Sequence, residues 1–187
     1  MRLIVGITGA SGAIFGVRTL AALRALGVET HLILSRWARV TIAQETNYAI
    51  EQVEQLATVV HRQENQAAAV SSGSFRTDGM IVAPCSMKTL AAIRAGFGDT
   101  LICRAADVIL KERRRLVLLA RESPLSEIHL ENMLALARIG VTIFPPVPAF
   151  YNKPQTVEAL VDYVVGRALD QFGLEVKEMP RWGGLGG

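Results

Sequence analysis

The fold is decided by the stretch Leu3-Ile4-Val5-Gly6-Ile7-Thr8-Gly9-Ala10-Ser11-Gly12-Ala13, close to the start of the chain. Its first five residues are mostly aliphatic and β-branched, which is typical of a buried strand. A glycine-punctuated turn follows, and a helical pattern of apolar residues begins near Phe15. Nucleotide-binding proteins use a strand, a small-residue turn and a helix as a phosphate cradle, because backbone N–H groups point outward where the helix begins. The stretch therefore predicts the first unit of an α/β fold.

The glycine spacing in this turn is Gly6-x-x-Gly9-x-x-Gly12, which differs from the dinucleotide pattern G-x-G-x-x-G. The spacing favours a mononucleotide over NAD. Gly9 and Gly12 allow positive φ and a close backbone approach, and Ser11 adds a hydroxyl where a phosphate or a flavin edge would fit. The alternative is a tight turn that binds no ligand.

The composition sets limits on the class of protein. The 187 residues suit a single domain over 1–187, with a tail from about residue 180. The chain is 50% hydrophobic and only 6% aromatic, which suggests strands buried on both faces or large surfaces buried between subunits. A net charge of +3, without interleaved arginines and aromatic residues, gives no reason to expect nucleic acid.

The expected location is the cytoplasm. Cys85 and Cys103 form neither a disulfide framework nor a metal-ligand spacing, which fits a reducing compartment. No apolar run is long enough to span a membrane, and the chain enters a strand directly, leaving no room for a signal peptide.

Strands and helices alternate along the rest of the chain, which predicts a doubly wound α/β sheet. Further strands are predicted at 28–34, at 79–83 with Pro84 as its stop, at 116–120 and at 140–144. Helices are predicted at 86–95 and 101–109, from Ser123-Pro124 onward, and at 157–169.

Ligands of such sheets bind at the carboxyl ends of the strands. Polar residues recur directly after the predicted apolar strands, and this recurrence is the strongest sign of a site in the residues themselves. They are Thr8 to Gly12, Ser35, Pro84 to Lys88, Arg121-Glu122, and Tyr151 at the end of a proline-rich loop.

Pro84-Cys85-Ser86-Met87-Lys88-Thr89 is a second candidate phosphate cradle, with a hydroxyl and backbone N–H groups at a helix N-terminus. The alternative is an ordinary N-cap by Ser86. Cys85 is a weaker candidate for a nucleophile, because no histidine lies near it in sequence and small buried thiols are common.

Charged residues supply a further set of candidates. Arg104, Asp107 and Lys111 share one helix stripe, which is either a solvated ion-pair ladder or an anion clamp. The pair Arg121-Glu122 at a strand end favours function. Arg167, taken alone, is a surface arginine on the last helix.

Together these motifs resemble the UbiX/Pad family of flavin prenyltransferases, and the resemblance covers nearly the whole chain. Two positions depart from the common pattern: Phe15 stands where many members have tyrosine, and Trp37 stands where a small residue is common. The tryptophan looks more like the Pad-type branch of the family. The matching motifs are Gly6-Ile7-Thr8-Gly9-Ala10-Ser11-Gly12, Ser35-x-x-Ala38 with Glu45-Thr46, Pro84 to Thr89, Arg104 to Val108, Lys111 to Arg114, Arg121 to Leu125, His129 to Leu134, Pro148 to Tyr151, and Arg181-Trp182.

The resemblance implies a Rossmann-like three-layer α/β/α sandwich with a mainly parallel sheet, assembled into a homododecamer. It also implies transfer of a dimethylallyl group from dimethylallyl phosphate to N-5 and C-6 of reduced FMN. The product, prenylated FMN, would serve a UbiD-type decarboxylase.

Residue roles carried over from the family divide into three sets. Arg104, Lys111, Tyr151 and Arg167 would hold the prenyl phosphate without a metal, since arginine, lysine and tyrosine suffice for a monophosphate and the chain has no Asp-Asp pair. Glu45 with Ser11 would relay protons, and Glu122 would be the base of ring closure. FMN would be held by Gly9, Ala10, Ser11, Ser35, Ser86, Met87, Lys88, Thr89 and Arg121.

Two other functions remain open at this point. One is a related flavoprotein decarboxylase acting on a C-terminal or pantothenate-linked cysteine, which would need a catalytic histidine and cysteine in contexts that this sequence lacks. The other is a non-catalytic FMN carrier, which would not need four phosphate-binding residues beside the flavin.

Overall fold

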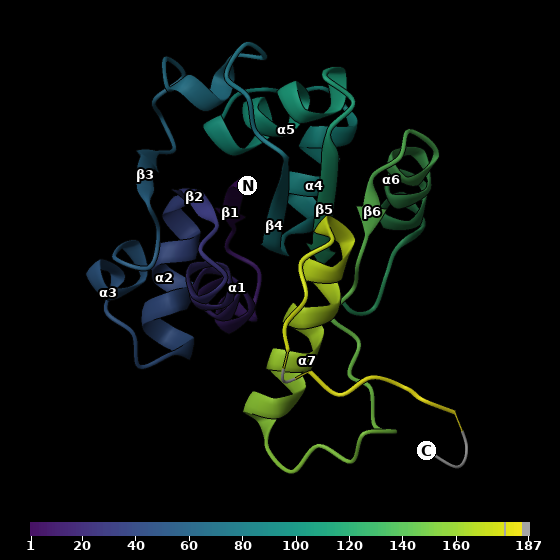
Figure 1. Ribbon diagram of the computed structural model, residues 1–187. Helices are drawn as coiled ribbons and strands as arrows, with labels where there is room; N and C mark the ends of the chain where they lie inside the picture. The colour runs from purple at the N-terminus through teal and green to yellow at the C-terminus, as the bar shows by residue number, and fades with distance from the viewer. Residues whose placement is uncertain (178, 185–187) are drawn as a thin grey trace.

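The protein forms a six-stranded, fully parallel sheet in a computed structural model that describes residues 1–177 and 179–184 (Figure 1). The strand order is β3-β2-β1-β4-β5-β6. The sheet confirms the doubly wound α/β prediction. The strands are β1 (Arg2–Ile7), β2 (Glu29–Leu34), β3 (Val59–Arg62), β4 (Gly79–Cys85), β5 (Arg115–Ala120) and β6 (Thr142–Ile143).

Helices cover both faces of this sheet and make the expected three layers (Figure 1). The first face packs against α1 (Ala13–Ala25), α2 (Arg36–Glu45) and α7 (Val157–Leu169). The second face packs against α4 (Met87–Arg94), α5 (Leu101–Lys111) and α6 (Glu127–Arg138). Three short elements complete the described chain: α3 (Ile50–Glu54), η1 (Ala69–Ser71) and η2 (Asp170–Phe172).

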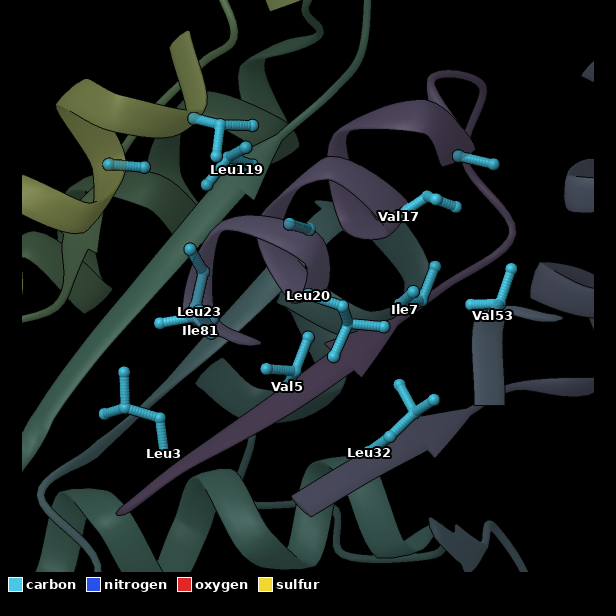
Figure 2. Packing of buried hydrophobic residues seen from close by; sticks show 14 of the residues in the cluster. Leu3, Val5, Ile7, Val17, Leu20, Leu23, Leu32, Val53, Ile81 and Leu119 are labelled. Atoms are coloured by element: carbon cyan, nitrogen blue, oxygen red, sulfur yellow. The ribbon is translucent and has the colours of Figure 1, made fainter. Parts of the chain in front are cut away.

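Strand β1 shows why the opening stretch of the sequence is apolar at nearly every position. Leu3, Val5 and Ile7 point to the first face, where Figure 2 shows Val5 and Ile7 beside Leu20 and Val17 of α1. Ile4 points to the second face and belongs to the cluster formed with α4 and α5. A parallel strand buried on both faces reads as a continuous apolar run rather than an alternating one.

The strand order reverses direction between β1 and β4. From β1 the chain winds outward through β2 to β3, and from β4 it winds to the other side through β5 to β6. Loops diverge at such a switch point and leave a crevice at the carboxyl ends of the strands. The turn after β1 and the turn after β4 flank this crevice, so the fold brings the two predicted cradles together.

Three predicted boundaries were wrong. Pro84 does not end its strand, because the register with β5 shifts between Val82 and Cys85, and an irregularity of this kind accommodates a residue without an N–H. Helix α6 begins at Glu127, since the hydroxyl of Ser126 caps the N–H of His129 (3.3 Å). The strand predicted at 140–144 shrinks to Thr142–Ile143.

Within the described residues, no helix combines the length and the apolar character needed to cross a membrane.

Candidate functional site

A cavity of about 610 Å³ opens at the switch point of the sheet. It lies between the turn after β1, the N-termini of α2 and α4, and the loop that joins α4 to α5. The lining residues are Thr8, Gly9, Ser35, Arg36, Trp37, Gln63, Ser86, Lys88, Thr89, Ala92, Phe97, Asp99, Thr100, Ile102 and Cys103.

Thr8 fixes the floor of this cavity by tying two loops together. Its buried hydroxyl donates to the carbonyl of Pro84 (2.8 Å) and accepts the N–H of Ser86 (2.9 Å). Its backbone N–H also donates to the Pro84 carbonyl (3.2 Å). The ends of β1 and β4 are therefore held in one rigid arrangement before any ligand binds.

Two helix N-termini aim at the cavity, and each is capped by a serine. The Ser35 hydroxyl accepts the N–H of Ala38 (2.9 Å), and the Ser86 hydroxyl accepts the N–H of Thr89 (3.3 Å). The first two N–H groups of a helix remain for a ligand when the cap satisfies the third. Both the capping and the ligand-binding interpretations of Ser86 can hold together, because its hydroxyl caps while the neighbouring amides stay free for an anion.

The N-terminus of α1 differs, because the chain's own carboxylate occupies it. Glu45 Oε2 accepts the N–H groups of Gly12 (2.8 Å) and Ala13 (3.1 Å). A carboxylate in this place does what a bound phosphate does at other helix N-termini. The interpretation of the first turn as a phosphate cradle is therefore wrong for these amides, although Gly9 of the same turn lines the cavity.

Glu45 is held in its ionised form. Burial pushes the pKa of Glu45 upward, but the N–H groups of Ala13 and Gly12, the Ser11 hydroxyl and the charge of Arg121 outweigh it and lower the pKa below its ordinary value. Glu45 and Ser11 are thus neighbours, as the proposed proton relay requires.

The Glu45→Gln substitution should lower the free energy of unfolding at pH 7 by about 0.3–1 kcal/mol, the usual worth of a charge at a helix N-terminus. A carboxylate with a lowered pKa stabilises the fold above its unfolded-state pKa, and this stabilisation disappears as the pH falls through the folded-state value. The difference between the two proteins should therefore fade as the pH falls from neutral through the ordinary glutamate pKa of 4.5 to the lower folded-state value. Urea denaturation across this range, with exposed Glu64→Gln as the control, would test it, and a difference independent of pH would refute it.

Several residues of the cavity were not predicted from the sequence. Trp37 packs so closely on Gly9 that a side chain at Gly9 would overlap it. Trp37 and Phe97 expose 65% and 62% of their surface and flank the opening. Gln63 directly follows β3, and its buried Oε1 has no partner among the described residues. The strand-end rule that identified Ser35 would have identified Gln63, had the end of β3 been predicted at Arg62.

Of the predicted flavin-binding residues, Gly9, Ser35, Ser86, Lys88 and Thr89 line the cavity, whereas Ala10, Ser11, Met87 and Arg121 do not. The Met87 side chain is buried in the core beneath α4, so only its backbone is available to a ligand. Arg121 follows β5, with its N–H bonded to the Cys85 carbonyl (3.1 Å). Glu122 is exposed beside it and accepts the N–H of Ser123 (3.1 Å).

The four predicted phosphate-binding residues form two pairs in one chain. Arg104 lies on α5, where it contacts Asp107 (2.7 Å) and the carbonyl of Ser71 (3.2 Å), and Lys111 near the end of the same helix pairs with Glu112 instead of Asp107. Tyr151 and Arg167 lie at α7, where the charge of Arg167 acts on the Tyr151 phenol. Because α5 and α7 cover opposite faces of the sheet, one chain does not bring the pairs together.

The cysteines and histidines offer no catalytic pair in the described part of the chain. Burial raises the pKa of the Cys85 thiol far above its ordinary value, so the nucleophile hypothesis fails. His31 and His61 bond to each other (2.8 Å), and none of the three histidines lines the cavity. His129 serves as an N-terminal capping residue of α6.

Comparison with known proteins shows which family the chain belongs to. The family model described as Flavoprotein matches residues 1–169. A protein of Bacillus subtilis (strain 168), described as a probable UbiX-like flavin prenyltransferase, is 62% identical over 185 residues, which are 99% of this chain and 91% of that one.

Two solved structures superpose on nearly the whole chain. AnUbiX (PadA1), solved in complex with FMN and dimethylallyl pyrophosphate, is 60% identical with a TM-score of 0.97 and 98% coverage of both chains. A protein of Escherichia coli O157:H7, described as a dodecameric FMN-dependent UbiX-like decarboxylase, is 62% identical with a TM-score of 0.97, over 98% of this chain and 100% of that one. The present chain belongs to the flavoprotein family and, within it, to the UbiX-like flavin prenyltransferases.

Proposed function

We propose that the chain joins a dimethylallyl group, taken from dimethylallyl phosphate, to N-5 and C-6 of reduced FMN, and that prenylated FMN then leaves for a UbiD-type decarboxylase. The observation that carries the proposal is the cavity at the switch point, where two helix N-termini and a glycine turn converge. The similarity of the whole chain to AnUbiX, which was solved with FMN and dimethylallyl pyrophosphate, supports FMN and a prenyl phosphate as the ligands.

The residues of the cavity fit FMN. A volume of about 610 Å³ lies within the range of about 300–1,000 Å³ that holds ligands of this size. The free amides at the start of α2 and α4 suit a phosphate, and exposed Trp37 and Phe97 offer aromatic surface to an isoalloxazine ring. The unpartnered Oε1 of Gln63 would accept a hydrogen bond from a ring N–H.

The reduced flavin supplies the nucleophilic ring atoms, and the protein supplies position, charge and proton transfer. Arg104, Lys111, Tyr151 and Arg167 would stabilise the charge that builds up on the phosphate as the allylic C–O bond breaks. Glu122 would remove the ring proton during closure. Glu45, already bonded to the α1 amides, would orient Ser11 and exchange protons through it.

Two copies of the chain would complete the phosphate site, because the pair on α5 and the pair at α7 lie on opposite faces of one chain. Their union therefore needs a neighbouring subunit. The dodecameric state described for the E. coli relative supports an assembly of this kind.

A homododecamer is thus the expected state in solution. Multi-angle light scattering at micromolar concentration should report a mass near twelve chains. A monomer at this concentration would contradict both the assembly and the shared phosphate site.

The alternatives have less support. A cysteine-specific decarboxylase would need a histidine and a thiol at the cavity, and only the thiol of Cys103 lies there among the described residues. A carrier would have no use for the cationic pairs. We place the reaction in the cytoplasm, where the free thiols of Cys85 and Cys103 would stay reduced.

Titration of the FMN-free protein with FMN should quench flavin fluorescence with a single saturating site, and FAD or NAD should bind more weakly. Anaerobic addition of dimethylallyl phosphate to the reduced complex should then release inorganic phosphate. Tighter binding of NAD or FAD would overturn the choice of cofactor. FMN binding without phosphate release would leave the carrier as the better function.

A further inference from the structure

The segment after η2 turns back and runs alongside α7 (Figure 1). Two contacts hold it against that helix. Met179 is buried and packs on Gly166 so closely that a Cβ at Gly166 would overlap its sulfur. Two residues later, both terminal nitrogens of Arg181 donate to Asp170, at 3.1 Å and 2.8 Å. We call the described residues of this segment, 174–177 and 179–182, the strap.

Trp182 extends the strap over a predicted substrate-binding residue. Its ring meets the Tyr151 ring edge-on, with centroids 5.3 Å apart and planes at 80°. Tyr151 is fixed from the other side as well, because its hydroxyl shares a hydrogen bond with that of Tyr163 (2.5 Å). The strap therefore contacts the part of the chain expected to hold the prenyl phosphate.

Asp170 connects the strap to the second residue of that half-site. Its Oδ2 lies 3.2 Å from Arg167 Nε, while both of its oxygens accept from Arg181. Its side chain is only 20% exposed. Arg167 uses its Nε for this contact. Its two terminal amino groups have no hydrogen-bond partner among the described residues, and a guanidinium can bind phosphate through such paired groups.

Both arginines also act on the Tyr151 phenol through their charge. The hydrogen bond with Tyr163 is the largest influence on the pKa of Tyr151 and raises it. Burial and the charge of the neighbouring phenol also raise this pKa, while the charges of Arg167 and Arg181 lower it. Asp170 contacts both arginines, and Trp182, the residue after Arg181, packs on Tyr151, so these contacts tie Arg167, the strap and Tyr151 together.

We propose that Asp170 is a positioning residue of the prenyl-phosphate half-site, which clamps the strap through Arg181 and orients Arg167 so that its terminal amino groups face the phosphate. The inference rests on the proposed function for the identity of the substrate. It assigns to Asp170 no contact with substrate or flavin.

The sign of the expected effect distinguishes positioning from simple electrostatics. Removing a negative charge beside two arginines raises the local positive potential, so charge alone predicts tighter anion binding. Lost orientation of Arg167 and a released strap predict weaker binding. Weaker binding by a variant without this carboxylate can therefore come only from lost geometry.

The test measures binding of dimethylallyl phosphate and of inorganic phosphate to the oxidised, FMN-loaded protein by calorimetry, where no turnover occurs. Asp170→Asn should weaken binding of both anions by about tenfold or more and leave FMN affinity unchanged. Asp170→Glu should recover part of the loss. The matched control is Glu175→Gln, because Glu175 lies 3.9 Å from Arg181 Nε and is 74% exposed, so its removal changes the charge without releasing the clamp.

Trypsin gives a second readout that does not depend on the phosphate. Cleavage after Arg181 should be faster in Asp170→Asn than in the natural protein or Glu175→Gln, because the arginine is no longer clamped. Arg181→Lys disrupts the same ion pair from its other partner, which is an exposed residue of the strap, so the substitution is not expected to cause misfolding. It keeps the charge, cannot make the paired contact, and should also weaken anion binding.

The proposal is overturned if Asp170→Asn and Arg181→Lys bind both anions as tightly as Glu175→Gln does. It is also overturned if the Asp170→Asn strap is cleaved no faster. Failure of the proposed function is a separate result: the natural protein would then release no phosphate with reduced FMN, while the titrations would still show whether Asp170 supports anion binding.

Discussion

Glu122→Gln is expected to let the first flavin–prenyl bond form and to slow ring closure by roughly 100- to 10,000-fold, the usual cost of removing one general base. Glutamine has the shape of glutamate and can keep the hydrogen bond that the carboxylate accepts from the Ser123 N–H (3.1 Å). It cannot accept the ring proton. The substitution therefore removes the chemistry while keeping the position at the end of β5.

The Glu122→Gln protein would be mixed rapidly with dimethylallyl phosphate under anaerobic conditions, and the reaction monitored by absorbance and by the mass of the quenched flavin. A flavin joined to the prenyl group through one bond only should accumulate. Glu131→Gln is the matched control, because Glu131 is an exposed glutamate on α6. Normal closure by the Glu122 variant would remove this residue from the role of base.

Arg167→Ala should leave FMN affinity nearly unchanged and lower turnover of dimethylallyl phosphate by about 100- to 1,000-fold, as expected when a group that stabilises transition-state charge is removed. Tyr151→Phe should also lower turnover while keeping the ring that packs against Trp182. Activity should survive EDTA, since arginine, lysine and tyrosine carry the phosphate in this proposal.

The measurement is prenylated flavin by mass spectrometry, with and without EDTA. Arg138→Ala on α6 is the control for loss of an exposed arginine. Full activity in both variants, or loss of activity with EDTA alone, would mean that the phosphate is held in another way.

The parts of the fold that depend on local apolar pattern could be predicted from the sequence. The continuous apolar run of β1 and most of the apolar stripe of α7 indicate burial directly, although Val157 at the start of α7 is exposed. The strand-end rule likewise identified Ser35 and Ser86, since the carboxyl ends of parallel strands meet at one edge.

Contacts between distant segments could not be predicted in the same way. Glu45 caps the amide of Gly12 from 33 residues away, and no local spacing signals such a pair. Asp170 and Arg181 are closer in sequence, yet their contact depends on the chain turning back along α7. In the tail predicted from about residue 180, Arg181 and Trp182 pack on their own chain, while residues 185–187 lie outside the described range.

The phosphate site shows a further limit of sequence reasoning. Arg104 and Lys111 lie two turns apart on α5, and the helical spacing predicted that they share one stripe. In the structure both lie beside the loop that contains Ser71 and Gly73, which the spacing did not indicate. No spacing within one chain indicates that Tyr151 and Arg167 lie across the sheet. Only the packing of α5 and α7 on opposite faces shows this, and it makes the proposed site a property of the assembly.

The mass of the flavin released after anaerobic incubation with reduced FMN and dimethylallyl phosphate tests the central claim most directly. We expect a flavin heavier than FMN by one dimethylallyl unit, formed by the natural protein and absent when the protein is omitted. Recovery of unmodified FMN from a protein that binds the flavin tightly would contradict it.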